Sequence, residues 1–340
     1  STAWKTPHGE YRFVGVNPNY TVARPRGLAC EDDVPNCNMQ PLFGSMDGFL
    51  SFQLIGYQQN FSAGECPSLF PLPRSVPNAA PAPPGAAMPN FVYKAGANAP
   101  HYGHDVFTVG LHTDGEPGKL GSFIPHGSQL LDTGPGRTYA SKDFADGQGR
   151  RLLWGWGPGS VLTLPREILW HPELQQLVFA PIPETALLRV PIGPRADVKL
   201  ALDNSSAVMQ MLTNNDVLVN GTAEVLLNAT RPSVAATFGI AVSTNLSASS
   251  NISAALGLYI YIAYIPPTKS GPHSVGLGIA DLGASKSHNN IHESFAVSDH
   301  DRFLSLQIYK DQDLLEVFWQ GGRVVKALRG GGGDIVAMLT

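Results

Sequence analysis

The sequence predicts an all-β protein. Short runs that alternate in polarity, or are rich in β-branched and aromatic residues, recur along the 340 residues, and Gly, Pro, Asn and Asp separate them. Convincing helical periodicity is scarce by comparison. Nine runs carry the pattern most clearly: residues 11–16, 49–57, 106–111, 151–156, 176–180, 235–242, 256–264, 303–309 and 314–319. Their spacing is typical of propeller blades or of a β-sandwich.

Two breaks interrupt these runs. Residues 71–100 are dense in Pro, Ala and Gly, which supply neither ladder donors nor a packed face, so we expect a surface loop there. The second break lies at residues 183–194. Beyond it Ser, Asn, Val and Leu become more frequent and Trp almost disappears. We therefore predict two domains, residues 1–188 and 189–340.

The composition argues against two classes of partner. Charged residues make up 15% of the chain and the net charge is −4, so no basic surface is expected that could hold phosphate backbones, and we expect no nucleic-acid partner. No apolar run reaches the roughly 20 residues that span a bilayer. The run at residues 254–265 is shorter and contains tyrosines, so we expect a buried strand pair there and no membrane partner.

Glycosylation motifs and cysteines indicate a compartment. Seven Asn-x-Ser/Thr acceptors favour a secretory route and hence a glycoprotein, although ordinary polar loops can also contain them. They are Asn19, Asn60, Asn204, Asn220, Asn228, Asn245 and Asn251. Cys30 and Cys37 close a short loop and could form a disulfide, which leaves Cys66 as the odd cysteine.

Two histidine-rich stretches could be taken for metal sites. His101, His104 and Asp105 have a suitable spacing, but zinc needs a third protein ligand on an ordered scaffold, and this stretch is rich in Pro, Gly and Asn. The histidines between residues 288 and 300 likewise lack an ordered scaffold that would bring enough ligands together. We therefore expect no metal ion. A Gly-x-Ser-x-Gly elbow, the mark of many serine hydrolases, does not occur.

Glu65 lies in a sequence context that could serve a site. It precedes Cys66 and Pro67, and the proline ends a strand and keeps the residues before it extended, which can direct a side chain into a cavity. Without further information, a glutamate in this context is more often a surface or ion-paired residue.

Two strings of residues change that interpretation. They are Gly64-Glu65-Cys66-Pro67-Ser68-Leu69-Phe70-Pro71 and Tyr139-Ala140-Ser141-Lys142-Asp143-Phe144, the second followed by Arg150-Arg151-Leu152-Leu153-Trp154-Gly155-Trp156. Further motifs keep the same order: Val106-Phe107-Thr108-Val109-Gly110, Asp132-Thr133-Gly134, Leu164-Pro165-Arg166-Glu167 and, near the end, Leu315-Glu316-Val317-Phe318. As a set they resemble glycoside hydrolase family 32, which contains invertases, fructan hydrolases and fructosyltransferases. The likeness is clear over residues 1–189 and weaker beyond.

The resemblance implies both a fold and an activity. The fold would be the later blades of a five-bladed β-propeller, residues 1–188, followed by a C-terminal β-sandwich, residues 189–340. The activity would be hydrolysis of terminal β-fructofuranosyl bonds of sucrose or fructans with retention, without a cofactor. The family also implies a secreted, cell-wall or vacuolar location. Retaining glycosidases use one carboxylate to attack the anomeric carbon and a second carboxyl group to protonate the departing oxygen. Glu65 would be that second group, the acid/base.

The resemblance also implies four residues at the substrate. Cys66 would form part of an apolar wall beside Glu65, and Asp132 would lie near the second sugar subsite. Tyr139 and Trp156 would offer flat apolar faces and polar edges to a furanose ring, with packing inside a blade as the alternative.

Three neighbouring residues are expected to be structural. Trp154 is expected in the core, because it alternates with Trp156 along one strand. Arg166 and Glu167 are expected to form a buried ion pair that supports a turn.

The sequence departs from the family in two places. Thr133 stands where the family usually has a tyrosine, and an insertion at residues 135–137 follows, so either Arg137 serves as the basic partner of Asp132 or the second subsite is rebuilt. In addition, neither the Asn-Asp-Pro nucleophile motif nor the Arg-Asp-Pro motif occurs in residues 1–340, and residues 1–5 resemble the segment that follows the latter. We therefore expect this span alone to lack the nucleophile and to be inactive, and a separate chain carrying that segment would be a partner.

Two other functions remain open at this point. The chain could be a non-catalytic homologue that binds fructan or sucrose, or acts as a partner subunit. It could also belong to a different class of propeller glycosidase, one that acts on arabinans.

Overall fold

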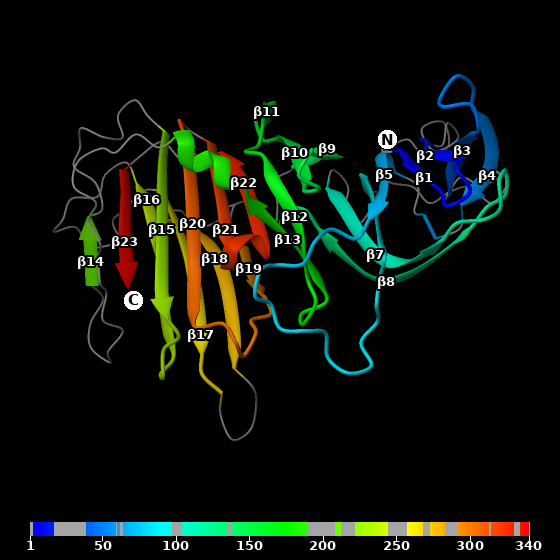
Figure 1. The fold of residues 1–340 in the computed structure, drawn as a ribbon. Helices are drawn as coiled ribbons and strands as arrows, with labels where there is room; N and C mark the ends of the chain where they lie inside the picture. Colours follow the sequence, from blue (N-terminus) through cyan, green and yellow to red (C-terminus); the bar gives the residue numbers. More distant parts are fainter. Residues whose placement is uncertain are drawn as a thin grey trace, which may run out of the picture. The chain divides into compact units, whose positions relative to one another are not determined.

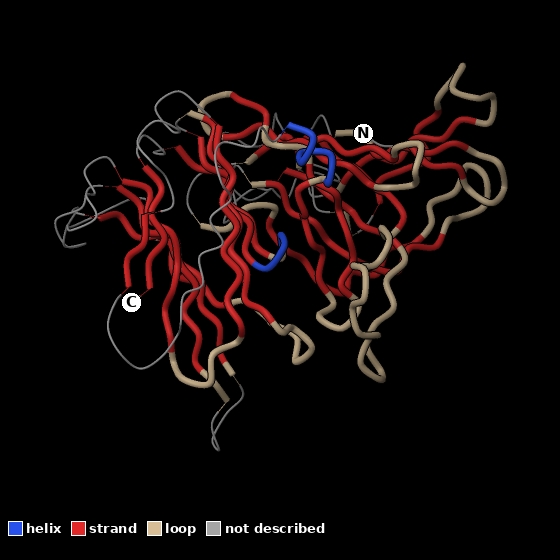
Figure 2. The backbone as a smooth tube through the Cα atoms, turned by 60° about the vertical axis from the view of Figure 1, so that its left-hand side comes forward, coloured by secondary structure: helices blue, strands red, loops and turns tan. Residues whose placement is uncertain are grey.

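The structure is a computed structural model that describes residues 3–16, 39–58, 60–61, 64–96, 104–134, 138–188, 208–211, 222–243, 257–267, 273–282, 291–312, 314–329 and 334–339. Within these ranges the regular structure is β-strand, apart from two short 3-10 helices at Pro183–Leu188 and Gln320–Gly322 (Figures 1 and 2). The all-β prediction is confirmed. Neither helix has the length and apolarity that crossing a membrane requires.

The chain divides into two compact units. Unit 1 comprises Ser1–Asp132, Arg137–Trp156 and Pro165–Leu177, and unit 2 comprises Thr133–Gly136, Gly157–Leu164 and Val178–Thr340. The last change of unit thus falls after Leu177. The domain boundary that the sequence suggested after residue 188 stays a prediction.

Residues 3–181 contain three antiparallel sheets, of which the first two lie within unit 1, while the third also includes β11 and most of β13 from unit 2. The first has the order β1-β2-β3-β4, the second β5-β6-β7-β8, and the third β11-β10-β12-β13 with β9 paired to β10. In the first two sheets each strand pairs with the next one in sequence, as in the blades of a propeller. The strands are β1 (Ala3–Lys5), β2 (Tyr11–Val14), β3 (Gln40–Ser45), β4 (Gln53–Gln58), β5 (Glu65–Pro71), β6 (Phe91–Gly96), β7 (Asp105–Thr113), β8 (Ser122–Leu130), β9 (Tyr139–Ala145), β10 (Arg151–Gly157), β11 (Val161–Leu162), β12 (Arg166–His171) and β13 (Gln176–Pro181).

Strand β6 corrects one expectation. Residues 71–100 were expected to be a surface loop, but Phe91–Gly96 forms an interior strand of the second sheet, paired with both β5 and β7. The run Phe91-Val92-Tyr93 supplies the side chains: Val92 and Tyr93 are buried, and Tyr93 stacks on Phe61 with 4.3 Å between ring centroids. The Pro-rich composition of the segment as a whole concealed this short apolar run.

Unit 2 is a β-sandwich. A six-stranded sheet, β14-β23-β16-β17-β18-β19, faces a four-stranded sheet, β15-β20-β21-β22, and apolar side chains of both sheets form one core cluster (Figure 1). On β17, for example, Leu258, Ile260, Ile262 and Tyr264 alternate into that core. The strands are β14 (Val208–Met211), β15 (Thr222–Thr230), β16 (Ala236–Ser243), β17 (Gly257–Ile265), β18 (Ser274–Leu282), β19 (Ile291–Ser294), β20 (Phe303–Asp311), β21 (Leu314–Trp319), β22 (Val324–Arg329) and β23 (Asp334–Leu339).

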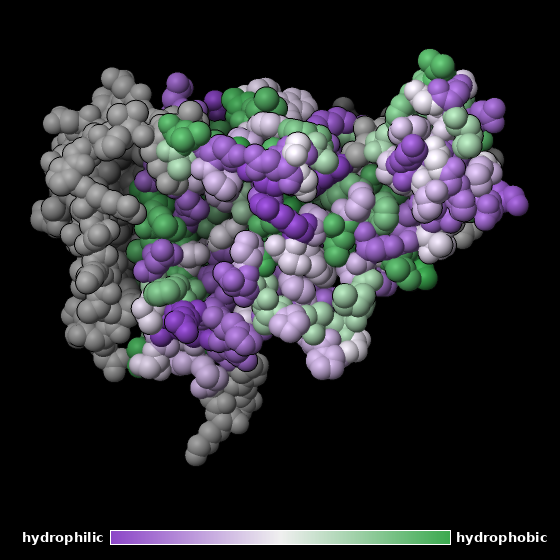
Figure 3. Space-filling model, in the orientation of Figure 1, coloured by the Kyte–Doolittle hydropathy of each residue, from purple (hydrophilic) through white to green (hydrophobic). Residues whose placement is uncertain are grey.

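The first sheet of unit 1 carries exposed apolar side chains. Phe13 stacks on Phe43 with 5.0 Å between ring centroids, and Phe52 meets Phe13 edge-on at 4.9 Å. Phe52, Leu54 and Leu50 are 41%, 51% and 87% exposed, so this apolar surface extends to the β3–β4 connection, where Figure 3 shows hydrophobic side chains at the surface. Contiguous exposed apolar surfaces often mark sites of interaction with another molecule.

Candidate active site

Glu65 is the first residue of β5 and lies at a β-bulge. Its backbone pairs with Gly96 at the end of β6, and the register between the two strands shifts between Glu65 and Ser68. Cys66 has a positive φ of 50°, which is uncommon for a residue with a side chain. Pro67 follows and has no N–H to donate to the ladder. The sequence Glu-Cys-Pro therefore interrupts the regular pairing between Glu65 and Ser68, and the side chain of Glu65 is half-buried.

Tyr139 contacts Glu65 directly. Tyr139 is the first residue of β9, and its hydroxyl donates a short hydrogen bond to Oε2 of Glu65. The ring reaches the carboxylate across Gly96, because a Cβ atom at position 96 would lie 2.7 Å from Cε2 of Tyr139 and would displace it. The glycine on β6 thus makes room for the contact between β9 and β5.

The environment keeps Tyr139 protonated. Burial raises the pKa of the Tyr139 hydroxyl well above its ordinary value, and the hydrogen bond to Glu65 and the charges of Glu65 and Asp105 raise it further. Tyr139 therefore stays a hydrogen-bond donor across the physiological pH range. A permanent donor fixes the orientation of Oε2 of Glu65.

Cys66 and Trp156 lie next to this pair. Cys66 is a free, half-buried thiol adjoining Glu65, and its charged form would also act on Tyr139. Trp156 is the cross-strand partner of Tyr139 on β10, and its side chain is 50% exposed. The structure thus brings Glu65, Cys66 and Tyr139 together and places Trp156 opposite Tyr139. Cys30 and Cys37, the suggested disulfide, lie outside the described residues.

Asp132 has a different environment from the other predicted site residues. Its side chain is fully buried; Oδ2 accepts a hydrogen bond from Thr138 Oγ1 at 2.6 Å, and Oδ1 lies 3.5 Å from Nη1 of Arg166. Arg166 is therefore a basic partner of Asp132. Arg137, which the sequence suggested for that role, lies outside the described residues.

The expected ion pair between Arg166 and Glu167 is wrong. Glu167 accepts two hydrogen bonds from Arg74, at 2.6 and 3.0 Å, while Arg166 faces Asp132. The physical reason is the strand itself, because successive side chains of β12 point to opposite faces of the sheet and cannot pair with each other.

Trp154 also differs from the prediction. It is half-buried instead of lying in the core, and it stacks on the exposed ring of Phe144 with 5.5 Å between ring centroids. Lys142 is the cross-strand partner of Trp154. The prediction failed because residues two apart on a strand share one face, so spacing alone did not separate Trp154 from the exposed Trp156.

A buried polar cluster next to Tyr139 was missed in the sequence. Lys94 on β6 and Asp105 at the start of β7 are both fully buried, with Nζ 3.6 Å from Oδ2. Oδ2 of Asp105 accepts the backbone N–H of Ser141 at 2.7 Å, and Nζ of Lys94 donates to the backbone oxygen of Ser141 at 2.5 Å. The available signal was a lysine inside the apolar run Phe91–Gly96, where a buried charge requires partners.

The suggested metal ligands do not form a cluster in the described part of the chain. His101 and the first histidine of the 288–300 stretch lie outside it, and Asp105 is engaged by Lys94 and Ser141. Among the described residues no group of three or more His, Cys, Asp or Glu side chains could hold a metal ion.

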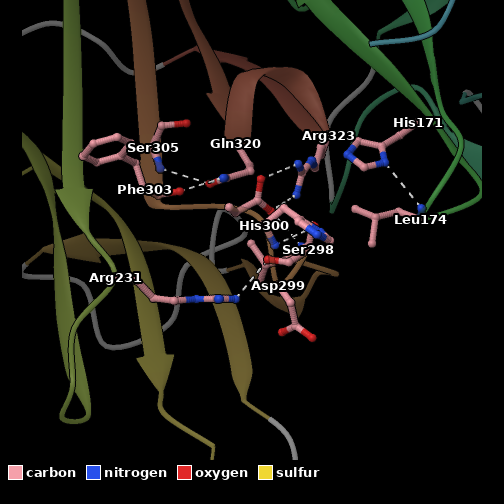
Figure 4. Close-up of polar contacts among 12 residues, drawn as sticks. His171, Leu174, Arg231, Ser298, Asp299, His300, Phe303, Ser305, Gln320 and Arg323 are labelled. Carbon is pink, nitrogen blue, oxygen red and sulfur yellow. Dashed lines mark hydrogen bonds and ion pairs between the residues drawn. The ribbon is translucent and has the colours of Figure 1, made fainter. Parts of the chain in front are cut away.

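A second polar cluster, in unit 2, has a structural role. Arg323 donates to both oxygens of Asp301, at 2.5 and 2.8 Å, and Arg231 donates to the backbone oxygen of Ser298 at 3.1 Å (Figure 4). Gln320 bonds the backbone of Ser305 and Phe303 in the same view. Arg323 and Arg231 thus hold the connection between β19 and β20 to the segments before β22 and after β15, and Gln320 binds the start of β20.

Comparison with known proteins gives the sequence relatives. No family model matches the chain. It is 30% identical over 156 residues to the insoluble isoenzyme CWINV1 of β-fructofuranosidase from Arabidopsis thaliana, an alignment that covers 40% of this chain and 26% of that protein. It is 23% identical over 371 residues to the vacuolar acid β-fructofuranosidase 4 of the same plant, covering 95% of this chain and 52% of that protein. The chain thus spans about half the length, or less, of these relatives.

Solved structures give the fold. Fructan 1-exohydrolase IIa from Cichorium intybus, crystallised with 1-kestose, matches 99% of this chain and 70% of its own with a TM-score of 0.56 and 18% identity. The family 32 β-fructofuranosidase BmSUC1 of Bombyx mori matches 99% of this chain and 62% of its own, with a TM-score of 0.56 and 16% identity. Sucrose-6-phosphate hydrolase from Lactobacillus gasseri reaches a TM-score of 0.59 at 15% identity, over 99% of this chain and 64% of its own. The resemblance to glycoside hydrolase family 32 is confirmed by these neighbours, and the chain has the propeller-and-sandwich fold of that family's fructosidases.

Proposed function

We propose that this chain carries the acid/base part of a β-fructofuranosidase, a glycosidase that cleaves terminal β-fructofuranosyl bonds of sucrose or fructans with retention. The observation that carries the proposal is the hydrogen bond from Tyr139 to Glu65, formed where β5, β6 and β9 meet, with Trp156 exposed beside it. The sequence relatives are β-fructofuranosidases, and solved neighbours were crystallised with 1-kestose and with sucrose.

Glu65 would act twice in the reaction. As an acid it would give its proton to the glycosidic oxygen while a carboxylate nucleophile attacks the anomeric carbon, so that the bond to the departing sugar breaks and a fructosyl-enzyme ester forms. As a base it would then take a proton from the water that hydrolyses the ester. The nucleophile and a further aspartate that stabilises the transition state would come from the motifs that residues 1–340 do not contain.

The neighbouring side chains would bind the sugar. Trp156 would offer an exposed ring face to the furanose, Cys66 would form part of an apolar wall, and Tyr139 would hold Glu65 in one orientation. Asp132 is buried between Thr138 and Arg166, so it would support the second sugar subsite through those partners and not by direct contact.

The test is Glu65→Gln in a protein with the nucleophile segment supplied. We expect kcat on sucrose to fall by about 10² to 10⁴, the usual range for losing a general acid or base, with little change in KM. An activated fructoside needs less help from an acid, so it should be affected less. Glu116→Gln is the matched control, because Glu116 is an exposed glutamate of the same unit. Equal losses on both substrates would show that Glu65 has a structural role.

A non-catalytic, fructan-binding or partner-subunit role is the competing function. It predicts that the protein with the supplied segment still binds 1-kestose but releases no fructose, and that Glu65→Gln changes neither result. Calorimetry and a fructose assay on the same samples separate the two functions.

We also propose a secretory route. Two of the seven acceptors lie in described residues: Asn228 is exposed on β15, whereas Nδ2 of Asn60 donates to the backbone oxygen of Phe123 at 2.9 Å. A glycan on Asn60 would leave Nδ2 with a single N–H and would compete with that hydrogen bond. Peptide mapping of the native protein should therefore find Asn228 glycosylated more completely than Asn60, and bare asparagines at all seven positions would contradict this route.

A further inference from the structure

The ion pair of Lys94 and Asp105 needs an explanation beyond stability. Both side chains are fully buried, and apolar residues of similar volume would often give an equally stable interior, because removing two charges from water is costly. A fully buried ion pair can instead serve to hold another group of the protein in position. Here that is the backbone of Ser141, whose N–H and C=O are bonded by Asp105 and Lys94 respectively.

Ser141 lies in an irregular part of β9. Tyr139 pairs with Trp156 and Lys142 pairs with Trp154, so that Ala140 and Ser141 together stand opposite the single residue Gly155. Ala140 has a positive φ of 49°, as expected for a bulge. A bulge takes backbone groups out of the ladder, and buried backbone groups need partners. The side chains of Lys94 and Asp105 supply those partners from the neighbouring sheet.

The bulge sets the position of Tyr139. Tyr139 lies two residues before Ser141, and its ring passes close to Gly96 on the way to Glu65. Gly96 lies two residues after Lys94 on β6 and pairs with Asp105. The ion pair and the tyrosine ring therefore both lie at the end of β6. A shift of Ser141 would move the ring and lengthen its hydrogen bond to the carboxylate.

We propose that Lys94 and Asp105 are positioning residues that hold the bulge of β9 and thereby keep the Tyr139 hydroxyl on Glu65. The catalytic consequence rests on the proposed function of Glu65. The placement of Tyr139 does not, and it can be measured without activity.

The first experiment observes Tyr139 itself. Lys94→Met removes the donor to Ser141 but keeps an unbranched side chain of similar length. The protein with the supplied nucleophile segment is labelled with 3-fluorotyrosine, and its 19F resonance for Tyr139 is assigned by its loss in Tyr139→Phe. We expect Lys94→Met to move this resonance toward the position of exposed fluorotyrosines and to let the hydroxyl titrate at a lower pH.

Arg12→Met is the matched control. Arg12 is also fully buried in unit 1, and its Nε donates to Glu10 at 2.8 Å, so both substitutions leave a buried carboxylate without its cation. General destabilisation would affect the two variants alike. Only Lys94→Met should move the Tyr139 resonance. An unchanged resonance in folded Lys94→Met, or an equal change in both variants, would overturn the proposal.

A double variant covers the risk of unfolding. Lys94→Met with Asp105→Asn removes both charges, so no uncompensated charge remains buried, and the asparagine oxygen can still accept the Ser141 N–H. We expect this protein to fold and to show the same displaced resonance, because the bond to the Ser141 oxygen is still lost. If neither variant folds while Arg12→Met does, the pair supports the whole fold and not the tyrosine, and the proposal fails.

The second experiment measures turnover. Lys94→Met should lower kcat by about 10- to 100-fold with little change in KM, since a misplacement of about 1 Å can cost that much, and Arg12→Met should leave kcat unchanged. A displaced resonance with unchanged kcat would refute the catalytic consequence alone. If the unsubstituted protein is inactive, the proposed function fails, and the resonance still decides whether the ion pair positions Tyr139.

Discussion

Both units of this chain have apolar cores and bury charged side chains, Glu316 and Lys326 of unit 2 among them, but the fully buried ion pairs described above belong to unit 1. In unit 2 the facing sides of the two sheets form a core of alternating apolar side chains such as Ile260, Leu306 and Trp319. In unit 1 the ion pairs Lys94–Asp105 and Asp132–Arg166 are fully buried. The difference coincides with the regularity of the strands. Four strand pairs of unit 1 contain register shifts, whereas the described pairs of unit 2 run without one.

This comparison shows why charges are buried where they are. A regular ladder satisfies its own backbone, so the side chains on its inner face can be apolar. At a bulge some backbone N–H and C=O groups lose their strand partner, and a polar side chain must take its place. The irregular strand ends in unit 1 are also where Glu65 and Tyr139 meet. The ion pair of Lys94 and Asp105 thus bonds the irregular strand that carries Tyr139.

Breaking a buried ion pair of unit 1 should have the largest effect on stability. Arg166→Met leaves Asp132 charged and buried, so we expect the free energy of unfolding to fall by about 3–5 kcal/mol in urea denaturation. Adding Asp132→Leu should recover part of the loss, because the uncompensated charge is then absent. A double variant that is less stable than Arg166→Met would contradict this account of unit 1.

A cavity in unit 2 should cost slightly less. Leu306→Ala removes a fully buried side chain of β20, and we expect a loss of about 2–5 kcal/mol. Leu226→Ala in the neighbouring strand β15 is the control; Leu226 is 53% exposed, and its loss should stay within about 0.5 kcal/mol. Equal effects of the two substitutions, measured by urea denaturation, would show that the apolar core does not carry the stability of the sandwich.

The exposed apolar face of the first sheet should affect association more than stability. We expect residues 1–340 alone to release no fructose from sucrose or inulin and to associate, because the aromatic surface around Phe13 and Phe52 lies open. Leu50→Ser with Leu54→Ser should increase the monomer fraction in size-exclusion chromatography with light scattering. A wild-type monomer that releases fructose would require a nucleophile within this span.

The smallest effect should come from an exposed carboxylate of the same sheet. Hydrogen bonds from the side chain and backbone N–H of Ser51 and from Ser45 lower the pKa of Asp47 from 3.8 to about 2. A lowered pKa stabilises the folded state above the unfolded value, and this contribution is lost as the pH falls from about 4 to about 2. Asp47→Asn should reduce the pH dependence of unfolding in that window. An NMR titration of Asp47 with a midpoint near its ordinary value would contradict the assignment.

The sequence predicts the regular parts of both units well. The run at residues 256–264 becomes the single strand β17 instead of the strand pair expected at residues 254–265, and the runs at 303–309 and 314–319 become β20 and β21. Alternation reflects one buried and one open face. The prediction failed at β6, where composition over thirty residues concealed a six-residue strand. The alternation of apolar and polar residues predicts a strand only where the strand is regular and long enough to show a period of two.

The site was only partly predictable. Glu65, Cys66, Tyr139 and Trp156 could be named from the motifs, since the family resemblance orders them along the chain. Lys94 could not, because its partner Asp105 and the Ser141 backbone come from separate strands, and no local pattern links a lysine on β6 to a bulge on β9. Likewise, the sequence around Asp132 does not indicate that Arg166 is its partner, because that contact depends on the strand register of the third sheet.

The close approach of Tyr139 to Gly96 also makes these two positions epistatic. Any side chain at position 96 collides with the tyrosine ring, so Gly96→Ala should be harmful while residue 139 is aromatic and far milder once it is serine. The effect of a substitution at either position therefore depends on the residue at the other. In a library that varies both, acceptable residues will occur as combinations, and a scan of single substitutions will underestimate how much this part of the protein can change.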